Sequence, residues 1–332
     1  MKVDYHVHLE EGPYSVRWWQ RTAEALQAFS PIAEEKHTLA WMEQLSERMA
    51  ARIRKGAYSQ EWLDLYRIRA KELGLTQVGI VDHLYRFTEF KPYFEQHMHL
   101  ADDQLGRMQR IWLNQVCTSS LDDFVAFITE QKAIWAEDGL TLRLGLEADY
   151  FLGGETVLRP IIDKYPWDHI IGSIHFVDGW GFDNPEAVER FDQSDLRELY
   201  EKLFGMVESA IRSGLFDIIA HLDNLKVFGH RISDEELVPH YRRIAQLLQE
   251  YGIATEINTG LYYRYPVKEM CPAYSFLQLL QEQGVPITTS SDSHFPDHLG
   301  SYLGEARALL RQAGYREIAT FESRVRKMVE LD

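Results

Sequence analysis

The chain alternates short apolar runs with longer amphipathic stretches, which is the pattern of strands that alternate with helices. Seven apolar runs are predicted strands, and they cover residues 3–8, 76–81, 142–146, 170–174, 216–220, 253–257 and 285–290. Helices are predicted at about 100–116, 120–139, 195–213, 234–251, 299–313 and 321–329. Strands and helices that alternate in this way predict an α/β fold with a parallel sheet.

One long helical stretch interrupts this alternation. Residues from about 16 to 73 are rich in Ala, Glu, Arg, Gln and Leu, and apolar residues recur at helical spacing, as at Leu39, Met42 and Leu45. This stretch predicts two or three helices inserted between the first two strands. Since no internal repeat or linker is visible, residues 1–332 are predicted to form a single domain whose insertion covers the active site.

Side chains that bind metals follow the predicted strands at their C-terminal ends. Six of the seven runs lead to a histidine or a carboxylate, and the seventh ends on Asn258; the residues are His6, His8, His83, Glu147, His175, His221, Asp292 and His294. In a parallel barrel the C-terminal strand ends converge on the active-site face. The pattern therefore predicts a metal-dependent barrel.

The first of these pairs is informative because of its spacing. Successive side chains of a strand alternate faces, so His6 and His8 leave the backbone on the same side. An H-x-H pattern is weak evidence by itself, because His97 and His99 repeat it in a polar connection where a solvated pair is the better interpretation. Asp292 and His294 add the same spacing at the last strand, and the whole set is hard to explain as ordinary buried histidines.

Composition and charge argue against several classes of function. The 332 residues carry a formal charge of −16, which argues against a surface that binds nucleic acid. The two cysteines lie far apart without a C-x-x-C pattern, so neither a disulfide framework nor a thiolate metal site is expected. No run approaches the roughly 18 apolar residues of a membrane span, and no leader is recognised. We expect a cytoplasmic protein without a membrane partner.

The strand-end motifs resemble those of the polymerase and histidinol phosphatase (PHP) superfamily. They are His6-x-His8, Asp82-His83, Gly145-Leu-Glu147, Gly172-Ser-Ile-His175-Phe, Ala220-His221-Leu-Asp223 and Ser291-Asp292-Ser-His294. The resemblance covers nearly the whole chain apart from the insertion. The stretch Gly172–Phe176 followed by Gly179–Asp183 is similar to the histidinol-phosphate phosphatase branch, as are 221–226 and 256–261.

The resemblance implies a distorted seven-stranded (β/α)7 TIM-like barrel that holds two or three divalent ions. One ion would be bound by His6, His8, Glu147 and Asp292; Glu147 would bridge to a second ion on His175 and His221, and a third would use His83 and His294. The family commonly has another histidine soon after the H-x-H, where this chain has Glu10 and Glu11. Either Glu11 or Glu10 replaces it, or the third site is weak; a solvated acidic turn is the alternative interpretation of the two glutamates.

Nitrogen and carboxylate ligands without thiolates suit zinc, manganese or iron, among which the sequence does not choose. The resemblance implies a phosphatase that acts on a small phosphorylated substrate, histidinol phosphate of histidine biosynthesis in particular. The reaction expected is in-line attack of a metal-bridging hydroxide, with Glu147 and Asp292 essential for catalysis.

Residues for the substrate are predicted from basic and titratable groups near the strand ends. Arg264 is the first candidate for the phosphate because guanidinium can donate two parallel hydrogen bonds, and Lys226 and Arg231 come next. For each of these three residues, the alternative is a charge on the protein surface that takes no part in substrate binding. His230 is the predicted general acid, with His298 as the second candidate. Asp4, Asp82 and Asp223 are expected to orient imidazoles, or to cap helices instead.

Other functions stay open at this point. They are a PHP phosphoesterase for nucleotides or other small phosphates, an amidohydrolase-type metal hydrolase, and a metal-binding module without catalysis. An amidohydrolase often bridges its metals with a modified lysine, whereas Glu147 stands at the corresponding strand end here. The oligomeric state is not predicted.

Overall fold

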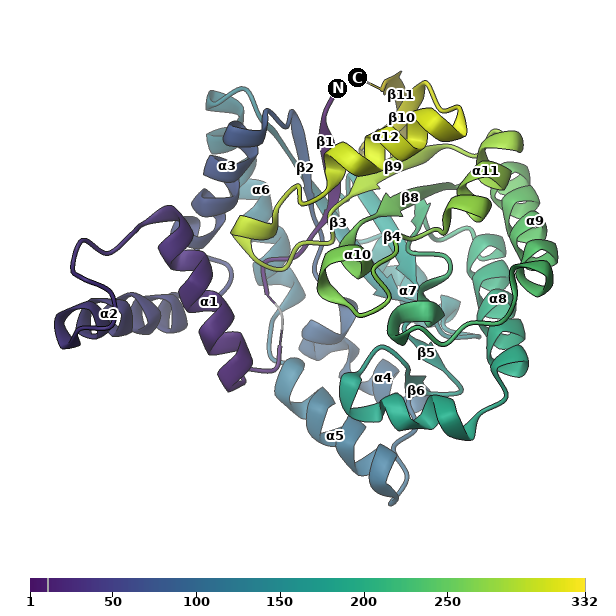
Figure 1. The fold of residues 1–332 in the computed structure, drawn as a ribbon, viewed down its shortest axis with the longest axis horizontal. Helices are drawn as coiled ribbons and strands as arrows, with labels where there is room; N and C mark the ends of the chain where they lie inside the picture. The colour runs from purple at the N-terminus through teal and green to yellow at the C-terminus, as the bar shows by residue number, and fades with distance from the viewer. Residues whose placement is uncertain (11, 332) are drawn as a thin grey trace.

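Seven parallel strands form the centre of the fold in the computed structural model, which describes residues 1–10 and 12–331 (Figure 1). The strands are β1 (Val3–Val7), β2 (Gln77–Ile80), β3 (Thr141–Asp149), β4 (His169–Ser173), β7 (Ile218–Ile219), β8 (Ala254–Asn258) and β9 (Ile287–Ser290). They pair in the order β1-β2-β3-β4-β7-β8-β9, and every pair is parallel. The predicted strands and the expected α/β barrel are confirmed.

The barrel nearly closes where β9 meets β1. The carboxylate of Asp4 accepts a hydrogen bond from the Ser291 amide at 2.8 Å, and the Thr289 hydroxyl donates to the Val3 carbonyl at 2.6 Å. Beyond the strands, the His8 amide donates to the Ser293 carbonyl at 2.8 Å. Residues from the two ends of the chain are thereby brought side by side.

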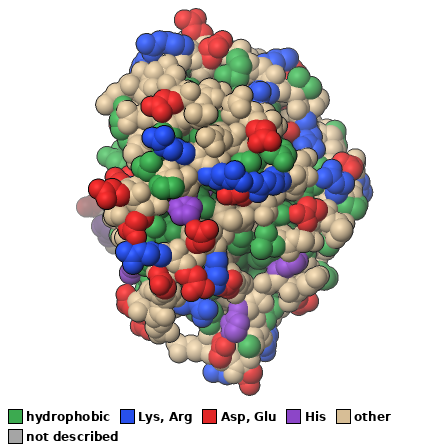
Figure 2. All heavy atoms as spheres, turned by 90° about the vertical axis from the view of Figure 1, so that its right-hand side faces the viewer, with side chains coloured by type: hydrophobic (Ala, Val, Ile, Leu, Met, Phe, Trp, Pro, Cys, Tyr) green, Lys and Arg blue, Asp and Glu red, His purple; other side chains and the backbone are tan. Residues whose placement is uncertain are grey.

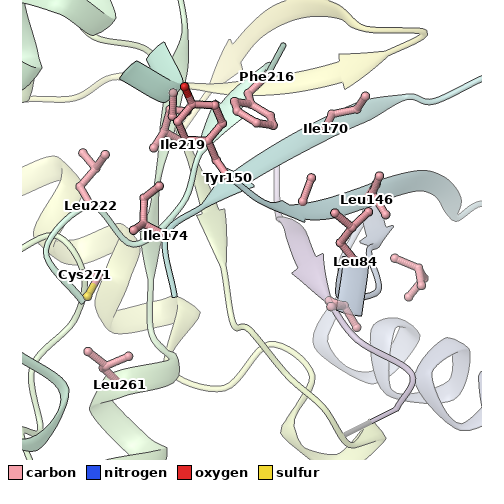
Figure 3. Packing of buried hydrophobic residues seen from close by; sticks show 14 of the residues in the cluster. Leu84, Leu146, Tyr150, Ile170, Ile174, Phe216, Ile219, Leu222, Leu261 and Cys271 are labelled. Carbon is pink, nitrogen blue, oxygen red and sulfur yellow. The ribbon is translucent and has the colours of Figure 1, made fainter. Parts of the chain in front are cut away.

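Helices surround this barrel. The longer ones are α5 (Gln104–Val116), α6 (Leu121–Glu137), α8 (Leu196–Arg212), α9 (Asp234–Tyr251), α11 (Tyr274–Glu282) and α12 (Leu303–Ala313), and the shorter ones are α4 (Lys91–His97), α7 (Glu155–Ile162) and α10 (Gly260–Arg264). Buried side chains such as Leu146, Ile170 and Ile219 pack the strands of the core (Figure 3). Acidic and basic side chains are interspersed on the outer face over α8 and α9 (Figure 2). None of the described helices has the length and hydrophobicity to cross a membrane.

The stretch between the first two strands contains three helices, as predicted. They are α1 (Val16–Phe29), α2 (Leu39–Lys55) and α3 (Gln60–Leu73), and α1 and α2 project to one side of the barrel (Figure 1, left). The Tyr66 hydroxyl of α3 donates to the His8 carbonyl at 2.8 Å, and the Trp62 indole donates to the Leu9 carbonyl at 2.9 Å. Helix α3 therefore holds the backbone at the end of the H-x-H motif.

The predicted C-terminal helix is wrong. Residues 317–330 form an antiparallel hairpin of β10 (Glu317–Glu322) and β11 (Val325–Glu330), joined by Ser323 and Arg324 in left-handed backbone conformations with φ of +49° and +63°. The Phe321 amide donates to the Tyr5 hydroxyl, and the Arg324 guanidinium pairs with Asp217. These tertiary contacts outweigh the local helix preference of the sequence.

A buried histidine occupies the space that two glycines leave. A Cβ atom at Gly145 would lie 2.5 Å from the His169 ring, and one at Gly79 would lie 2.7 Å from it. The His169 ring contacts the Tyr5 carbonyl at 2.9 Å, and burial lowers the pKa of this histidine to about 4. His169 therefore has a structural role in the core.

We predict that Gly145→Ala destabilises the protein by about 1–3 kcal/mol, because overpacking a closed core forces neighbouring groups apart. The measurement is urea unfolding followed by circular dichroism. Gly205→Ala is the matched control: Gly205 lies within α8, and a Cβ there meets no atom within 4 Å. The control is expected to gain about 0.5–1 kcal/mol from helix propensity. Equal stability of the two variants would contradict the packing described for His169.

Candidate metal centre

Eight side chains that can bind metals meet at the C-terminal ends of the strands, and each is less than a tenth exposed. They are His6, His8, His83, Glu147, His175, His221, Asp292 and His294. Three groups within this set have ligand atoms close enough for one ion: His8, His83 and His294; His6, His8 and Asp292; and His83, Glu147 and His175. The structure thus brings together the eight residues predicted from the strand ends.

Glu147 lies between two sets of imidazoles. One carboxylate oxygen, Oε2, is 3.2 Å from His6 Nε2 and 3.4 Å from His8 Nε2. The other, Oε1, is 3.2 Å from His221 Nε2 and 3.5 Å from His175 Nε2. Oε2 also lies 2.7 Å from His83 Nδ1, so the two oxygens face separate sets of imidazole nitrogens. This is the arrangement expected of a carboxylate that bridges two ions.

Unsatisfied buried atoms test whether metals fit this cluster. Among the described residues, no hydrogen-bond partner is found for His6 Nε2, for either His8 ring nitrogen or for Glu147 Oε2. Buried polar atoms are normally paired, and imidazole nitrogens with carboxylate oxygens suit Zn²⁺, Mn²⁺ or Fe²⁺. The donor set therefore fits two or three divalent cations.

The electrostatics of the cluster favour the metal-binding forms of Glu147 and His8. Burial alone would raise the pKa of Glu147, but the imidazoles of His83 and His6 lower that pKa well below its usual range. Burial and the neighbouring His83 lower the pKa of His8 well below its ordinary value. Glu147 thus stays ionised and His8 stays neutral, as ligands must be. Burial opposes protonation of His6 and His175, but the nearby carboxylates outweigh it and raise the pKa of both histidines.

Two carboxylates behind the ligands were not predicted. Glu256 lies 3.0 Å from His6 Nδ1, and Asp149 lies 2.7 Å from His175 Nδ1. Each orients an imidazole through the nitrogen that faces away from Glu147. The available signal was their spacing, since Asp149 follows Glu147 by two residues on β3 and Glu256 precedes Asn258 by two on β8.

The three carboxylates that were predicted to orient imidazoles behave differently from one another. Asp82 accepts hydrogen bonds from the Leu9 amide and the Tyr58 hydroxyl, and it lies 3.9 Å from His8 Nδ1. Asp4 binds Ser291 and closes the barrel instead.

Asp223 forms an ion pair with a buried lysine. Lys226 Nζ is 2.9 Å from Asp223 Oδ2 and 2.8 Å from the Met270 carbonyl, and the lysine is only 1% exposed. The structure therefore does not bring Lys226 to a substrate, because its ammonium is already paired in the core.

Arg231 and His230 also differ from the prediction. Arg231 pairs with Glu269 at 3.0 Å and with Asp234 at 2.7 Å. The His230 ring stacks on Phe191 with centroids 4.5 Å apart, and neither Arg231 nor His230 lines the cavity above the cluster. The loop after Asn224 turns these side chains away, which strand-end reasoning does not detect.

Two backbone positions in the cluster are strained. His221 has a φ of +25° and Asp292 a φ of +52°, and both are residues with a Cβ atom. Such conformations cost on the order of 1–3 kcal/mol and persist where the surroundings enforce them. Here they aim the two side chains into the cluster.

The acidic residues after His8 were expected to complete a third ion site. Glu10 is buried, and its carboxylate accepts hydrogen bonds from the Trp18 indole at 2.6 Å and from Arg52 at 2.8 Å. Glu10 is thus turned to the insertion, and Glu11 lies outside the described residues. His8 is the third member of the group that contains His83 and His294.

A cavity of about 1190 Å³ opens above the cluster. The predicted phosphate residue Arg264 lines it, and Arg264 Nη2 lies 2.6 Å from Asp292 Oδ2. His298 and the α1 residues Trp18 and Arg21 line it as well. The insertion therefore contributes one wall of the cavity through α1.

We predict that Glu147→Gln lowers the metal content to less than about half of the wild-type value, because neutralising the shared carboxylate removes a ligand from both sides of the cluster. The measurement is inductively coupled plasma mass spectrometry on protein dialysed against Zn²⁺ and then against metal-free buffer. His99→Ala is the control, since His99 belongs to the other H-x-H and pairs with Asp103. Full metal content in Glu147→Gln would refute the bridging assignment.

Comparisons with known proteins agree with this geometry. The family model described as PHP domain matches residues 59–260. A Deinococcus radiodurans protein named "Probable histidinol-phosphatase" is 36% identical over 215 residues, covering 64% of this chain and 81% of that protein. The "Histidinol-phosphatase" of Lactococcus lactis is 23% identical over 260 residues, covering 69% of this chain and 93% of that protein.

A solved structure shares the fold. It is the histidinol phosphate phosphatase from Lactococcus lactis, complexed with zinc, L-histidinol and phosphate. The TM-score is 0.64 with 19% sequence identity, and the match covers 99% of each chain.

Proposed function

The chain belongs to the PHP domain family, and from this premise we propose that it is a metal-dependent phosphomonoesterase that hydrolyses L-histidinol phosphate to L-histidinol and phosphate. The observation that carries the proposal is the position of Glu147 between two sets of imidazoles, beneath a cavity that Arg264 lines. The names of the similar proteins support the choice of substrate.

Divalent ions bound in the cluster would lower the pKa of a water and neutralise charge on the phosphoryl oxygens. His6, His8 and Asp292 would hold one ion and His175 with His221 a second, with Glu147 shared between them. His83 and His294, with His8 beside them, would hold a third.

Arg264 is proposed to bind the phosphate. Its guanidinium lies at the wall of the cavity against Asp292, so a phosphoryl group above the ions would meet a cation whose charge is fixed at neutral pH. Asp292 holds the guanidinium in place through their ion pair, which reduces the freedom that Arg264 would lose on binding substrate.

His298 is a poor general acid at neutral pH. Burial, together with the nearby charge of Arg21, lowers the pKa of His298 to about 4. The imidazole is therefore neutral in the working range, and we assign it to the cavity wall beside Tyr263, whose ring lies 5.1 Å away. His230 is not positioned to protonate the leaving alkoxide either, because its ring stacks on Phe191 and does not line the cavity.

We further propose that residues 1–332 act as one domain, in which the insertion at 16–73 covers the active site, and that the protein works in the cytoplasm on a small phosphorylated molecule. A phosphatase for nucleotides is the rival, because the cluster and Arg264 suit any phosphate monoester.

Metal removal tests the proposal. We expect chelation and dialysis to abolish phosphate release, and Zn²⁺, Mn²⁺ or Fe²⁺ to restore it, with histidinol phosphate preferred over nucleoside monophosphates and an aryl phosphate. The measurement is kcat/KM for each substrate with reconstituted protein. A preference for nucleotides would replace the substrate and keep the metal assignment, whereas no release from any ester by metal-loaded protein would refute the phosphatase.

Replacement of the phosphate residue gives a second test. We predict that Arg264→Lys lowers kcat/KM for histidinol phosphate about 10- to 100-fold, because an ammonium keeps the charge but loses the planar pair of donors. Arg17→Ala is the control, since Arg17 also lines the cavity but is exposed. An unchanged kcat/KM in Arg264→Lys would remove Arg264 from the phosphate site.

A further inference from the structure

Helix α2 has one face against the protein and one face exposed. It lies at the outer end of the projection that α1 and α2 form beside the barrel (Figure 1, left). Its inner face is buried through Trp41, Leu45, Met49 and Arg52. The Arg52 guanidinium lies 4.4 Å from the centre of the Trp62 ring of α3, so the helix is held in place from the inside. The outer face is therefore presented in a fixed orientation.

A stripe of apolar and small side chains runs along the outer face. Its members follow one another at spacings of three or four residues, which places them on one side of a helix; they are Leu39, Met42, Ser46, Ala50 and Ile53. Leu39 is 76% exposed, Ile53 56% and Met42 44%. Single exposed apolar residues are common on protein surfaces, but a stripe over about four turns is typical of a seam that packs against a second helix.

Charged side chains of opposite sign flank the two halves of this stripe. Glu43 and Glu47 stand in the N-terminal half and Arg54 in the C-terminal half, and all three are exposed. None of the three makes an ion pair with another described residue, whereas the neighbouring Lys55 pairs with Glu61. Because eleven residues correspond to about three turns, Glu43 and Arg54 lie on the same side of the helix. Each of these two charges is thus available to a partner.

This pattern is complementary to itself about a two-fold axis. If two copies of α2 run antiparallel with the axis between Ser46 and Ala50, the small side chains meet at the centre, where they let the helices approach closely. Met42 then lies within one residue of the level of Ile53 of the second copy, and Glu43 lies within one residue of its Arg54. Two-fold symmetry makes each contact occur twice.

We propose that α2 is the contact through which two copies of this chain form a symmetric dimer, with the apolar stripes packed together and Glu43 paired with Arg54 of the other copy. The proposal does not depend on the proposed function. A single pair of helices buries less than the roughly 1,600 Å² of a standard stable interface. The dimer is therefore expected to be reversible, with a Kd on the order of 10 µM.

The test is sedimentation equilibrium of the full chain at concentrations from about 1 to 200 µM, which bracket the expected Kd. We expect the average mass to rise from that of one chain toward that of two. Arg54→Glu is expected to raise the Kd about 10-fold or more, because like charges then face each other on both sides of the axis. Arg242→Glu changes the net charge equally at an exposed position of α9, and is expected to keep the Kd within about twofold.

A mixture of variants makes the test specific for the pairing. Glu43→Arg is expected to weaken the dimer as Arg54→Glu does, and an equal mixture of the two variants to regain association, because both contacts then join opposite charges. Circular dichroism of each variant checks that the helices are retained. A chain that stays monomeric at about 200 µM, an equal effect of Arg54→Glu and Arg242→Glu, or a mixture that associates no better than its components would overturn the proposal.

Discussion

The closing contact between the first and the last strand is the interaction on which the site depends. Asp4 accepts hydrogen bonds from the Ser291 amide and from the Gly300 amide, and burial raises its pKa to about 6. A buried carboxylate is tolerated here because its oxygens are paired. The contact places His6 and His8 beside Asp292 and His294, which are nearly 300 residues away in the sequence, so without it the cluster would divide into two incomplete halves.

The buried cluster leaves several polar atoms of the described residues without a hydrogen-bond partner, and a bound cation would supply the missing interactions. Burial of several imidazoles and two carboxylates costs free energy unless their atoms are paired, and Glu147 Oε2 with His6 Nε2 and His8 Nε2 has no hydrogen-bond partner among the described residues. Glu256 and Asp149 remove part of this cost from behind, since each pairs with the far nitrogen of an imidazole. Bound metals would remove the rest, and the energy of metal binding would then add to the stability of the fold.

Much of this arrangement could be predicted because parallel strands impose it. Once seven apolar runs are strands of one barrel, their C-terminal ends converge, and residues such as Glu147 and His221 must meet whatever the loops do. The sheet places no such constraint on Lys226 and His230, which lie on a loop. Lys226 pairs with Asp223 in the core, and the His230 ring stacks on Phe191, so neither side chain reaches the cavity. The C-terminal hairpin escaped prediction for a similar reason, since its conformation depends on contacts with Tyr5 and Asp217 that lie far away in the sequence.

The segment after His8 shows how the insertion and the site are linked. This segment was expected to supply a ligand for a third ion, but the carboxylate of Glu10 lies against Arg52 of α2 and Trp18 of α1. Both partners belong to the insertion, and α3 holds the same backbone through Tyr66. Glu10 therefore joins the projecting helices to the strand that carries His8, and α1, fixed in this way, supplies a wall of the cavity. The attachment of the insertion thus makes use of a residue that lies two positions after His8 of the metal-binding pair.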